Sequence, residues 1–402
     1  MKEEVTVISI DEEKCCERGN AGCLELEAGL KTERLRAGDA GGVERAAELL
    51  RSGGTVAFPT ETVYGLGANA LDVEAVGKIY AAKQRPSWDP TIVHVDGREM
   101  LERVAAVPAG DEGRVVAKLM EAFWPGPLTL LLPRTAAVPD IVTAGRPLVG
   151  VRMPVHPVAL ELIRLAGVPV AAPSANRFGG TSPTMAAHVL VDLDGRINAV
   201  LDGGATSVGV ESTVLDVAAR AIYRPGAVTA AMIAEAIGEE VRVVSAAGGV
   251  EEEADSSAAL RNDKQERRND KQERWNNKQE RQNDTGMGLA SPGMGMRHYA
   301  PRARLVLVEG QEGLLREVAS HPVAEVGVML PDEWDAGDAG AVWRWGPWND
   351  AKILARLLFA GMRMLDGRGV QVIVCPMPTM GGLGEALRDR LGKAARGTSC
   401  RL

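Results

Sequence analysis

TVAFPTETVYGLG, residues 55–67, carries a short apolar run directly into hydroxyl-bearing residues and glycines. The apolar part, Thr55–Phe58, is typical of a buried strand, and α/β sheets commonly bind their ligands at the ends of such strands. In the part that follows, glycines and threonine hydroxyls would let backbone N–H groups approach a small polar ligand. A tight turn capped by threonines would use the same residues. The segment therefore predicts the end of a strand and leaves open whether a ligand binds there.

The alternation of short apolar runs and helical patterns extends from about residue 40 to residue 245. Such alternation predicts an α/β domain around a twisted, mixed sheet. The predicted strands are Thr55–Phe58, Thr91–Val95, Leu128–Leu132, Val168–Ala172, Ala199–Asp202 and Ser212–Val217, and the predicted helices are Val43–Arg51, Val73–Lys83, Arg114–Ala122, Pro157–Leu165 and Thr229–Ile237.

A second, smaller pattern of the same kind follows residue 303 and predicts a Rossmann-like α/β unit. Its predicted strands are Leu305–Val308, Val326–Leu330 and Val370–Val374, and its predicted helices are Leu314–Ala319, Ala351–Leu365 and Gly384–Ala394. We therefore expect four parts: an N-terminal strand with a poorly structured insertion (1–35), a larger domain (36–245), a linker (246–303) and a small C-terminal α/β domain (304–402).

The linker contains a tandem repeat, RNDKQER at 261–267 and 268–274 followed by WNNKQER at 275–281. A seven-residue repeat suggests a coiled coil, but no position of this one is apolar in more than one copy, so paired helices would have no seam to bury. Its 21 residues hold eight Lys or Arg and five Asp or Glu. This composition favours a solvated linker that is disordered or loosely helical. A basic arm that helps to hold RNA is the alternative interpretation.

The composition excludes several classes of protein. The chain has 402 residues, 45% hydrophobic and 25% charged, with a net charge of −8. The chain is too hydrophobic to be disordered throughout, and it is too acidic for a protein that coats duplex nucleic acid. No signal peptide or apolar stretch of membrane-spanning length is visible, and the five cysteines lack metal-like spacing. We therefore expect a cytoplasmic protein with reduced thiols and no membrane contact.

Three arginines, Arg85, Arg152 and Arg224, lie close to prolines at predicted ends of strands or helices. This placement is unusual for arginines that only solvate a surface, and together they indicate an anion-binding site. Lys83 and Arg85, one residue apart and followed by a proline, would suit a clamp for a phosphate or carboxylate. Cations at the C-terminus of a helix, favoured by its dipole, are the other interpretation of that pair.

Further polar side chains occupy similar positions, at predicted strand ends or at a predicted helix start. For His94, the histidine of this group, a hydrogen-bonded position in the core is the alternative to a role in a binding site. No P-loop, complete Rossmann fingerprint, GxSxG elbow or HExxH motif accompanies the set. The residues are His94, Ser174, Asn176, Ser182, Thr184 and Ser212.

As a set, these motifs resemble the YrdC-type threonylcarbamoyl-AMP synthases. The resemblance covers residues 43–240, with the motifs in the family's order and spacing. RHYAP at 297–301 and the small C-terminal unit are similar to the long, two-domain form of that family. The motifs are PTETVYGLG at 59–67, KxR at Lys83 and Arg85, IVH ending at His94, SxN at Ser174 and Asn176, and ESTV from Glu211.

The resemblance implies a YrdC-like domain with a twisted mixed sheet and a smaller C-terminal Rossmann-like α/β domain. It implies a nucleotidyltransferase that joins L-threonine, bicarbonate or CO2, and ATP into L-threonylcarbamoyl-AMP and releases pyrophosphate. Mg2+ is expected with ATP. The product would serve N6-threonylcarbamoylation of the adenosine beside the anticodon of tRNAs, through a downstream threonylcarbamoyl transferase complex. A weak contact with RNA is also expected.

Roles for single residues follow from the resemblance by position. Arg152 would pair with the carboxylate of threonine. Tyr299 is similar to a tyrosine that folds back over the nucleotide in the long form. Threonine would be contacted by Thr62, His94, Arg152 and Ser212; ATP would be held by Lys83, Arg85, Asp89, Ser174, Asn176, Ser182, Thr184, Arg224 and Tyr299; and Lys83, Arg85, Ser174 and Asn176 would be the catalytic residues.

The sequence departs from the family pattern at two of these positions and in the linker. Gln84 stands where the family usually has glycine, and Asp89 where it usually has an asparagine near ATP. A carboxylate there would repel phosphate unless it faces a cation, so Asp89→Asn is expected to lower the apparent KM for ATP. The charged repeat lengthens the linker before Tyr299, which weakens closure only slightly.

Two other functions remain open from the sequence. A non-catalytic module that binds double-stranded RNA or tRNA would place the same arginines in an exposed basic concavity. A carbamoyltransferase that depends on carbamoyl phosphate would use a similar domain, usually with additional cysteine-bearing parts that are absent here.

Overall fold

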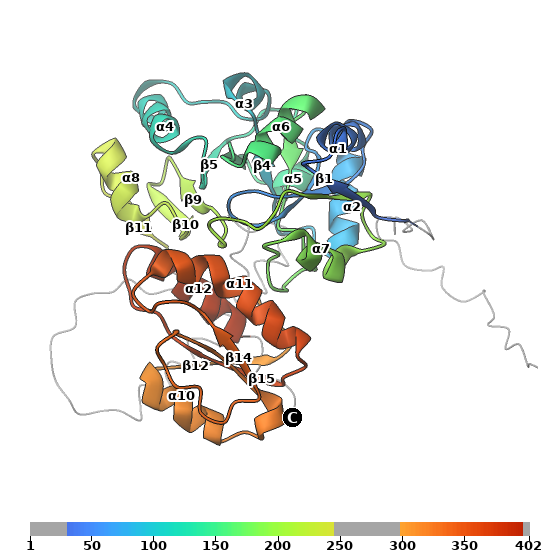
Figure 1. Cartoon of the computed structure of the whole chain (residues 1–402). Helices are drawn as coiled ribbons and strands as arrows, with labels where there is room; N and C mark the ends of the chain where they lie inside the picture. The colour runs from blue at the N-terminus through green and yellow to red at the C-terminus, as the bar shows by residue number, and fades with distance from the viewer. Residues whose placement is uncertain (1–29, 245–297, 397–402) are drawn as a thin grey trace, which may run out of the picture.

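The computed structural model describes residues 30–244 and 298–396, which form two α/β units stacked on each other (Figure 1). The predicted first strand, most of the insertion, the charged repeat and four of the five cysteines lie outside these residues. The fifth, Cys375, is buried, and burial raises the pKa of its thiol.

The larger unit contains a mixed sheet of eleven strands in the order β1-β8-β2-β3-β7-β4-β6-β5-β9-β10-β11. Strand β2 lies parallel to β8 and antiparallel to β3, and β4 lies parallel to β6 and antiparallel to β7. The mixed sheet confirms the predicted fold class. The strands are β1 (Glu33–Arg36), β2 (Val56–Phe58), β3 (Gly65–Asn69), β4 (Ile92–His94), β5 (Leu128–Pro133), β6 (Leu148–Arg152), β7 (Val170–Ala171), β8 (Ala199–Asp202), β9 (Thr213–Asp216), β10 (Ala221–Arg224) and β11 (Arg242–Val243).

Helices cover both faces of this sheet, as the alternation along β2 shows. Val56 and Phe58 pack into one apolar cluster, and Ala57 packs into another together with Ile79 and Val189. Because successive side chains of a strand point to opposite faces, these clusters lie on opposite sides of the sheet. The helices are α1 (Gly42–Arg51), α2 (Val73–Lys83), α3 (Arg98–Val104), α4 (Gly110–Phe123), α5 (Asp140–Thr143), α6 (Pro157–Ala166), α7 (Ala186–Leu193) and α8 (Ala230–Ile237).

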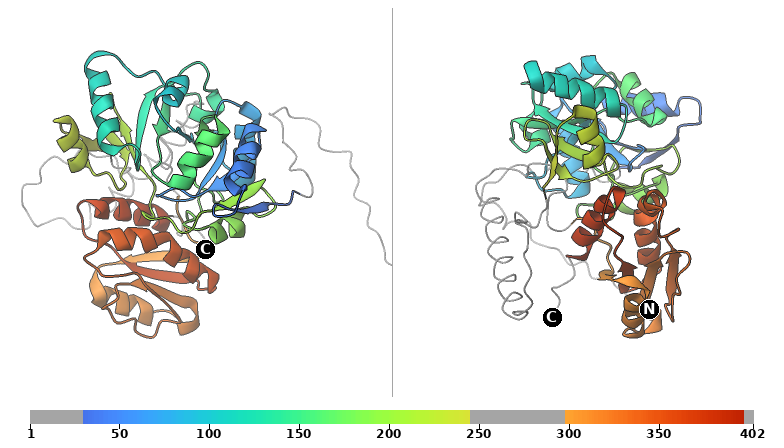
Figure 2. Two further views of the ribbon diagram at one scale, coloured as in Figure 1. Left: turned by 45° about the horizontal axis from the view of Figure 1, so that its top comes forward. Right: turned by 90° about the vertical axis from the view of Figure 1, so that its left-hand side faces the viewer.

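The smaller unit has a parallel four-stranded sheet in the order β12-β15-β13-β14. Leu314 of α10 packs with Val372 and Val374, whereas α11 and α12 pack with Ile373 and Cys375, so the helices again cover opposite faces. Helices α11 and α12 lie on the face turned towards the larger unit (Figure 1 and Figure 2). The elements are β12 (Arg304–Val308), α10 (Gly310–Ala319), the short 3-10 helix η1 (Val323–Glu325), β13 (Val326–Leu330), β14 (Ala341–Arg344), α11 (Ala351–Gly367), β15 (Val372–Pro376) and α12 (Leu383–Ala395).

Residues 11–35 were expected to form a poorly structured insertion after a first strand, but residues 33–35 belong to β1, which pairs in parallel with β8 at the edge of the sheet. The sequence left open whether the glycines of the motif 59–67 bring the backbone close to a ligand or form a turn. Both Gly65 and Gly67 lie inside β3, and Gly65 lines the cavity described below. A Cβ at Gly67 would lie 2.7 Å from the ring of Phe58 and from Val170, so close packing requires this glycine.

The two units share an apolar contact. Val63 and Val210 of the larger unit belong to the same buried cluster as Phe359 and Leu387 of the smaller one. Gly209, at a φ of +83°, approaches the backbone of α11 so closely that a Cβ would lie 2.4 Å from the Cα of Arg356. The segment that leads into β9 is therefore packed directly against the second unit.

Gln84 ends helix α2 in the left-handed conformation, with φ 54° and ψ 43°. Glycine adopts this conformation without steric cost, which explains physically why a glycine suits the position. Helix α6 ends in the same way at Gly167, with φ 65°.

We predict that Gln84→Gly raises the free energy of unfolding by about 1 kcal/mol, because it relieves left-handed strain. Gly167→Gln is the matched reverse change and should lower the stability by a similar amount, since no atom lies within 4 Å of a Cβ built there. Urea unfolding followed by circular dichroism measures both. A stability of Gln84→Gly at or below that of the natural sequence would contradict this account.

Candidate active site

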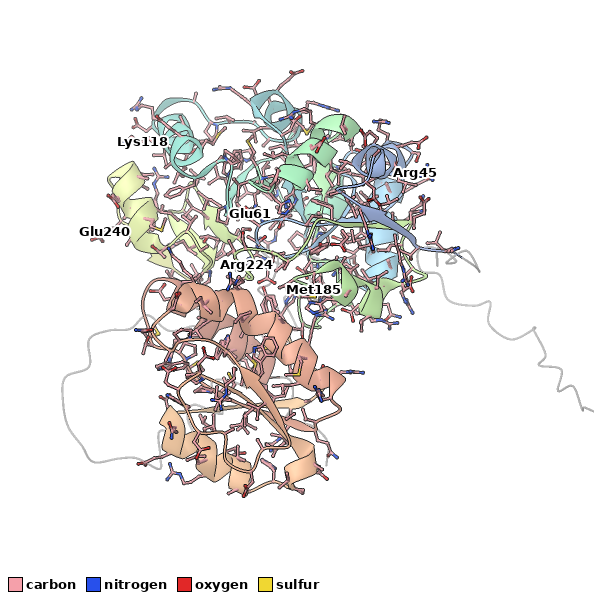
Figure 3. All side chains as sticks on the ribbon, in the orientation of Figure 1. Arg45, Glu61, Lys118, Met185, Arg224 and Glu240 are labelled. Atoms are coloured by element: carbon pink, nitrogen blue, oxygen red, sulfur yellow. The ribbon has the colours of Figure 1, made fainter. Side chains whose placement is uncertain are left out.

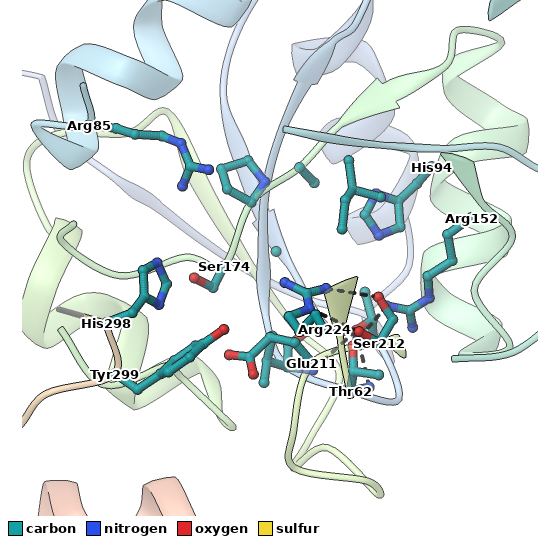
Figure 4. A pocket seen from close by; sticks show the side chains of 16 residues that line it. Thr62, Arg85, His94, Arg152, Ser174, Glu211, Ser212, Arg224, His298 and Tyr299 are labelled. Atoms are coloured by element: carbon teal, nitrogen blue, oxygen red, sulfur yellow. Dashed lines mark hydrogen bonds between the residues drawn. The ribbon is translucent and has the colours of Figure 1, made fainter. Parts of the chain in front are cut away.

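A cavity of about 50 Å3 lies in the larger unit, next to the segment that leads into the smaller one (Figure 4). The ends of β4 and β6, the segment after β7 and the segments around β9 and β10 form its walls. Residues 298 and 299 close it from the side of the second unit. Of the predicted site residues, it is lined by Thr62, Arg85, His94, Arg152, Ser174, Ser212, Arg224 and Tyr299.

The other predicted site residues are buried but do not line the cavity. The Lys83 ammonium donates to the backbone oxygens of Ser174 and Asn176, both at 2.5 Å. Burial, and next the charge of Arg85, hold the pKa of Lys83 well below its usual value. Lys83 therefore fixes the SxN segment in this state. The remaining residues of this group are Asp89, Asn176, Ser182 and Thr184.

Arg152 and His94 stand side by side at one end of the cavity, because β4 and β6 pair with these two residues in register. The Arg152 guanidinium donates to Thr62 Oγ1 at 2.9 Å and lies 2.5 Å from Glu61 Oε1. Burial, and next the positive charge of Arg152, lower the pKa of His94 to about 3. His94 is therefore neutral, and its Nδ1 has no hydrogen-bond partner among the described residues.

Arg224 crosses the floor of the cavity beneath Ser212. Its Nε donates to the backbone oxygen of Ser212 at 3.0 Å, and its Nη2 donates to Ser212 Oγ at 3.1 Å. Burial lowers the pKa of the Arg224 guanidinium. Arg224 thus carries a buried charge held by neutral oxygens, on the side of the larger unit that faces α12 (Figure 3).

His298 and Tyr299 close the cavity as part of a row of aromatic rings. The centroid of the His298 ring lies 6.0 Å from that of Phe178 and 4.2 Å from that of Tyr299. The Tyr299 ring stacks on Phe359 of α11, with 5.7 Å between the ring centroids. Tyr299 has a φ of +66°, rare for a residue with a side chain. Its hydroxyl points into the cavity towards Glu211 (Figure 4).

A charged network from α12 reaches the wall of the cavity. Arg390, fully buried, donates through Nε to Glu211 Oε2 at 2.8 Å, and its guanidinium lies 5.1 Å from the Tyr299 ring. The other carboxylate oxygen of Glu211 accepts from Ser182 Oγ at 2.5 Å. The second unit thereby contacts two walls of the cavity, at Glu211 and at Tyr299.

Comparison with known proteins places this architecture in a family. The family model described as "Telomere recombination" matches residues 48–226, and the model described as "Threonylcarbamoyl-AMP synthase, C-terminal domain" matches residues 228–396. The threonylcarbamoyl-AMP synthase of Pyrococcus abyssi is 40% identical over 359 residues, which cover 87% of this chain and 93% of the relative. The chain belongs to the threonylcarbamoyl-AMP synthase family.

Further comparisons extend over the whole architecture. The threonylcarbamoyl-AMP synthase of Bacillus subtilis is 40% identical over 367 residues, covering 88% of this chain and 93% of the relative. The crystal structure of Pyrococcus abyssi Sua5 complexed with L-threonine has a TM-score of 0.74 at 37% identity, and covers 90% of this chain and 97% of that one. The two-unit form is thus shared with these synthases.

Four residues of the site were not among the residues predicted from this synthase family's motifs. Glu61 and Glu211 stand inside two of those motifs, but their roles depend on Arg152 and Arg390, which are distant in the sequence. The motif HYAP drew attention to Tyr299, and His298 beside it lines the same cavity. Nothing in the local sequence around Arg390 distinguishes it from the other cations of α12.

Within 30–244 and 298–396, no group of three His, Cys, Asp or Glu side chains could hold a metal ion. No helix in the same ranges is long and apolar enough to cross a membrane.

We predict that His94 stays neutral down to pH 5, so that its ring resonances in NMR do not titrate between pH 8 and pH 5. Since the unfolded chain takes up a proton near pH 6.5 and the folded chain does not, stability falls as the pH drops below 6.5. From the pKa of about 3, this residue alone lowers the free energy of unfolding by about 2 kcal/mol between pH 7 and pH 5. A His94→Gln variant should lose that part of the pH dependence. An identical pH dependence in both proteins would contradict the assignment.

We predict that Arg390→Met costs about 3–5 kcal/mol of stability, because it leaves the buried Glu211 carboxylate unpaired. The double variant Arg390→Met/Glu211→Gln should recover part of this loss, since the glutamine still accepts from Ser182. Urea unfolding of both single variants and the double variant gives the coupling free energy. Strict additivity of the two single changes would show that the pair is not coupled.

Proposed function

We propose that this chain synthesises L-threonylcarbamoyl-AMP from L-threonine, bicarbonate or CO2, and ATP, as a nucleotidyltransferase that releases pyrophosphate. The observation that carries the proposal is the convergence of Arg85, Arg152 and Arg224 on one cavity, in a chain that matches synthases over most of their length. Three separated cations suit substrates that carry a carboxylate at one end and phosphates at the other.

The chemistry needs no protein nucleophile. The amine of threonine attacks the carbon of CO2, loses a proton and becomes a carbamate. A carbamate oxygen then attacks the α-phosphorus of ATP, and the bond from that phosphorus to the bridging oxygen breaks to release pyrophosphate. The protein has to align the two reactants, balance charge and exclude water from a labile carbamate.

Threonine would bind at the end of the cavity formed by β4 and β6. The Pyrococcus abyssi relative has been crystallised with L-threonine. In this chain, Arg152 would bind the carboxylate while Glu61 and Thr62 hold its guanidinium in place. His94, being neutral, can accept a hydrogen bond from the threonine hydroxyl or amine through Nδ1. Ser212 completes this end, held by Arg224 and by Thr129 Oγ1 at 2.7 Å.

ATP would occupy the opposite end, between Arg85, Ser174, Arg224 and Tyr299. At this end, His298 Nδ1 and the Tyr299 hydroxyl are buried and have no hydrogen-bond partner among the described residues, which fits a site that takes polar ligand groups. Mg2+ would enter on the phosphates of ATP with water as its other ligands, since the described residues offer no carboxylate cage.

Closure over the substrates would follow from the segment at 298–299. His298 and Tyr299 line the cavity on the side of the smaller unit. A movement of this segment would widen the entrance for ATP, and its return would shelter the reaction from water.

The product would be passed to a tRNA-modifying threonylcarbamoyl transferase, with a weak RNA contact at most. A non-catalytic RNA-binding module is disfavoured because Arg85, Arg152 and Arg224 are 8%, 3% and 5% exposed. To contact the phosphate backbone of an RNA, these arginines would have to lie at the surface.

We predict that radiolabelled bicarbonate enters an acid-labile adenylate only when ATP, Mg2+ and L-threonine are all present. Arg152→Ala should raise the KM for threonine, and Arg85→Ala the KM for ATP, each by at least tenfold. Separation of the adenylate by thin-layer chromatography measures both. Label incorporated from carbamoyl phosphate in place of bicarbonate would favour the carbamoyltransferase, and no label with ATP bound would contradict the synthase.

A further inference from the structure

We propose that Asp89 is a positioning residue for Arg85: its buried carboxylate fixes the guanidinium towards the cavity and balances its charge while the site is empty. This inference deepens the proposed function. It rests on that function because it requires the phosphates of ATP to bind at Arg85. The asparagine that the family pattern favours at this position would supply an acceptor but no charge.

The contacts of Arg85 all lie along one edge of its guanidinium. Nε donates to the backbone oxygen of Asp89 at 3.0 Å, and Nη2 donates to the backbone oxygen of Pro90 at 2.6 Å. Nη2 also lies 3.0 Å from Oδ2 of Asp89, and the two side chains are 3% and 2% exposed. The guanidinium points into the cavity, which Arg85 lines (Figure 4).

Aromatic rings and a tyrosine hydroxyl complete the support. The rings of Tyr80 and Phe178 lie 5.9 Å and 6.0 Å from the guanidinium carbon. The Tyr80 hydroxyl contacts the backbone oxygens of Asp89 and Ile141, at 3.0 Å and 2.8 Å. The loop that carries Asp89 is therefore itself fixed, and the carboxylate can act as a rigid anchor.

Besides holding the Arg85 guanidinium in place, the Asp89 carboxylate acts through its negative charge. Lys83 lies close enough for the charge of Arg85 to lower its pKa, so the carboxylate offsets repulsion between two buried cations. The same negative charge opposes the phosphates of ATP. Asp89 does not line the cavity, so it acts on ATP through Arg85 and by its field, not by contact.

Two substitutions separate these effects. Asp89→Asn keeps an acceptor for Nη2 and removes the charge, so the KM for ATP should fall about five- to tenfold while kcat stays within about twofold. Asp89→Ala removes both, so Arg85 loses its anchor and kcat should fall at least tenfold. The KM for threonine should change in neither variant, because that end of the cavity is held by Arg152.

The experiment measures kcat and both KM values in the full chain, and the binding of ATP with Mg2+ by isothermal titration calorimetry. Glu239→Gln is the matched control: it makes the same change of net charge and removes a carboxylate 2.7 Å from Arg220, outside the site. It should leave every value unchanged.

Tighter binding of ATP by Asp89→Asn, with the control unchanged, supports the proposal even if Asp89→Ala does not fold. Equal ATP binding in the natural protein and in Asp89→Asn overturns it. A parallel rise in both KM values would also overturn it, since that is the effect of a merely structural carboxylate. Failure of the natural protein itself to bind ATP would instead remove the proposed function, and this inference with it.

Discussion

Buried positive charge is the constraint that shapes both units. Five cations around the cavity are at most 8% exposed, and burying each one costs several kcal/mol unless other groups compensate. Three of them have a carboxylate partner at 3.0 Å or less. The other two are held by neutral oxygens. Arg224 lines the cavity, where an anionic substrate would complete its charge, whereas Lys83 lies behind the wall and its pKa is held well below the usual value. The paired cations are Arg85, Arg152 and Arg390, and the unpaired ones are Lys83 and Arg224.

This constraint explains why the motif residues lie far apart in the sequence but together in space. A carboxylate can compensate a buried arginine only at contact distance, so Glu61 has to meet Arg152 across 91 positions. In the sheet, β7 and β4 separate β3 from β6, so the segment between β2 and β3 that carries Glu61 has to extend past the strand ends to reach Arg152. In the same way, Glu211 meets Arg390 only because α12 packs against the larger unit. The apolar contact at Val63 and Val210 brings that helix into place.

The sequence predicted the parts of the fold that have a long or repeated pattern. Helix α2 lies at the predicted residues, and β2, β4, β5, β8 and β9 agree within a residue or two. Strand β1 was missed because four residues with one leucine carry too short an alternation. Strand β3 was missed because its glycines, typical of turns, are required here by the ring of Phe58. The sequence identified the side chains of the candidate site that could face a ligand. Local patterns could not identify the side chains that face other protein groups, which are Glu61, Glu211 and Arg390.

Tyr299 shows why closure of the cavity depends on the second unit. A tyrosine in the left-handed conformation costs about 1–3 kcal/mol, so the surrounding structure has to hold it there. Its ring is held between Phe359, which stacks on it, and the guanidinium of Arg390. Both come from the smaller unit, whereas the cavity that the hydroxyl enters belongs to the larger one. Because Arg390 also pairs with Glu211, the docking of α12 and the closed position of Tyr299 use the same side chain. Closure and docking of the two units are therefore coupled, and neither unit alone contains the complete site.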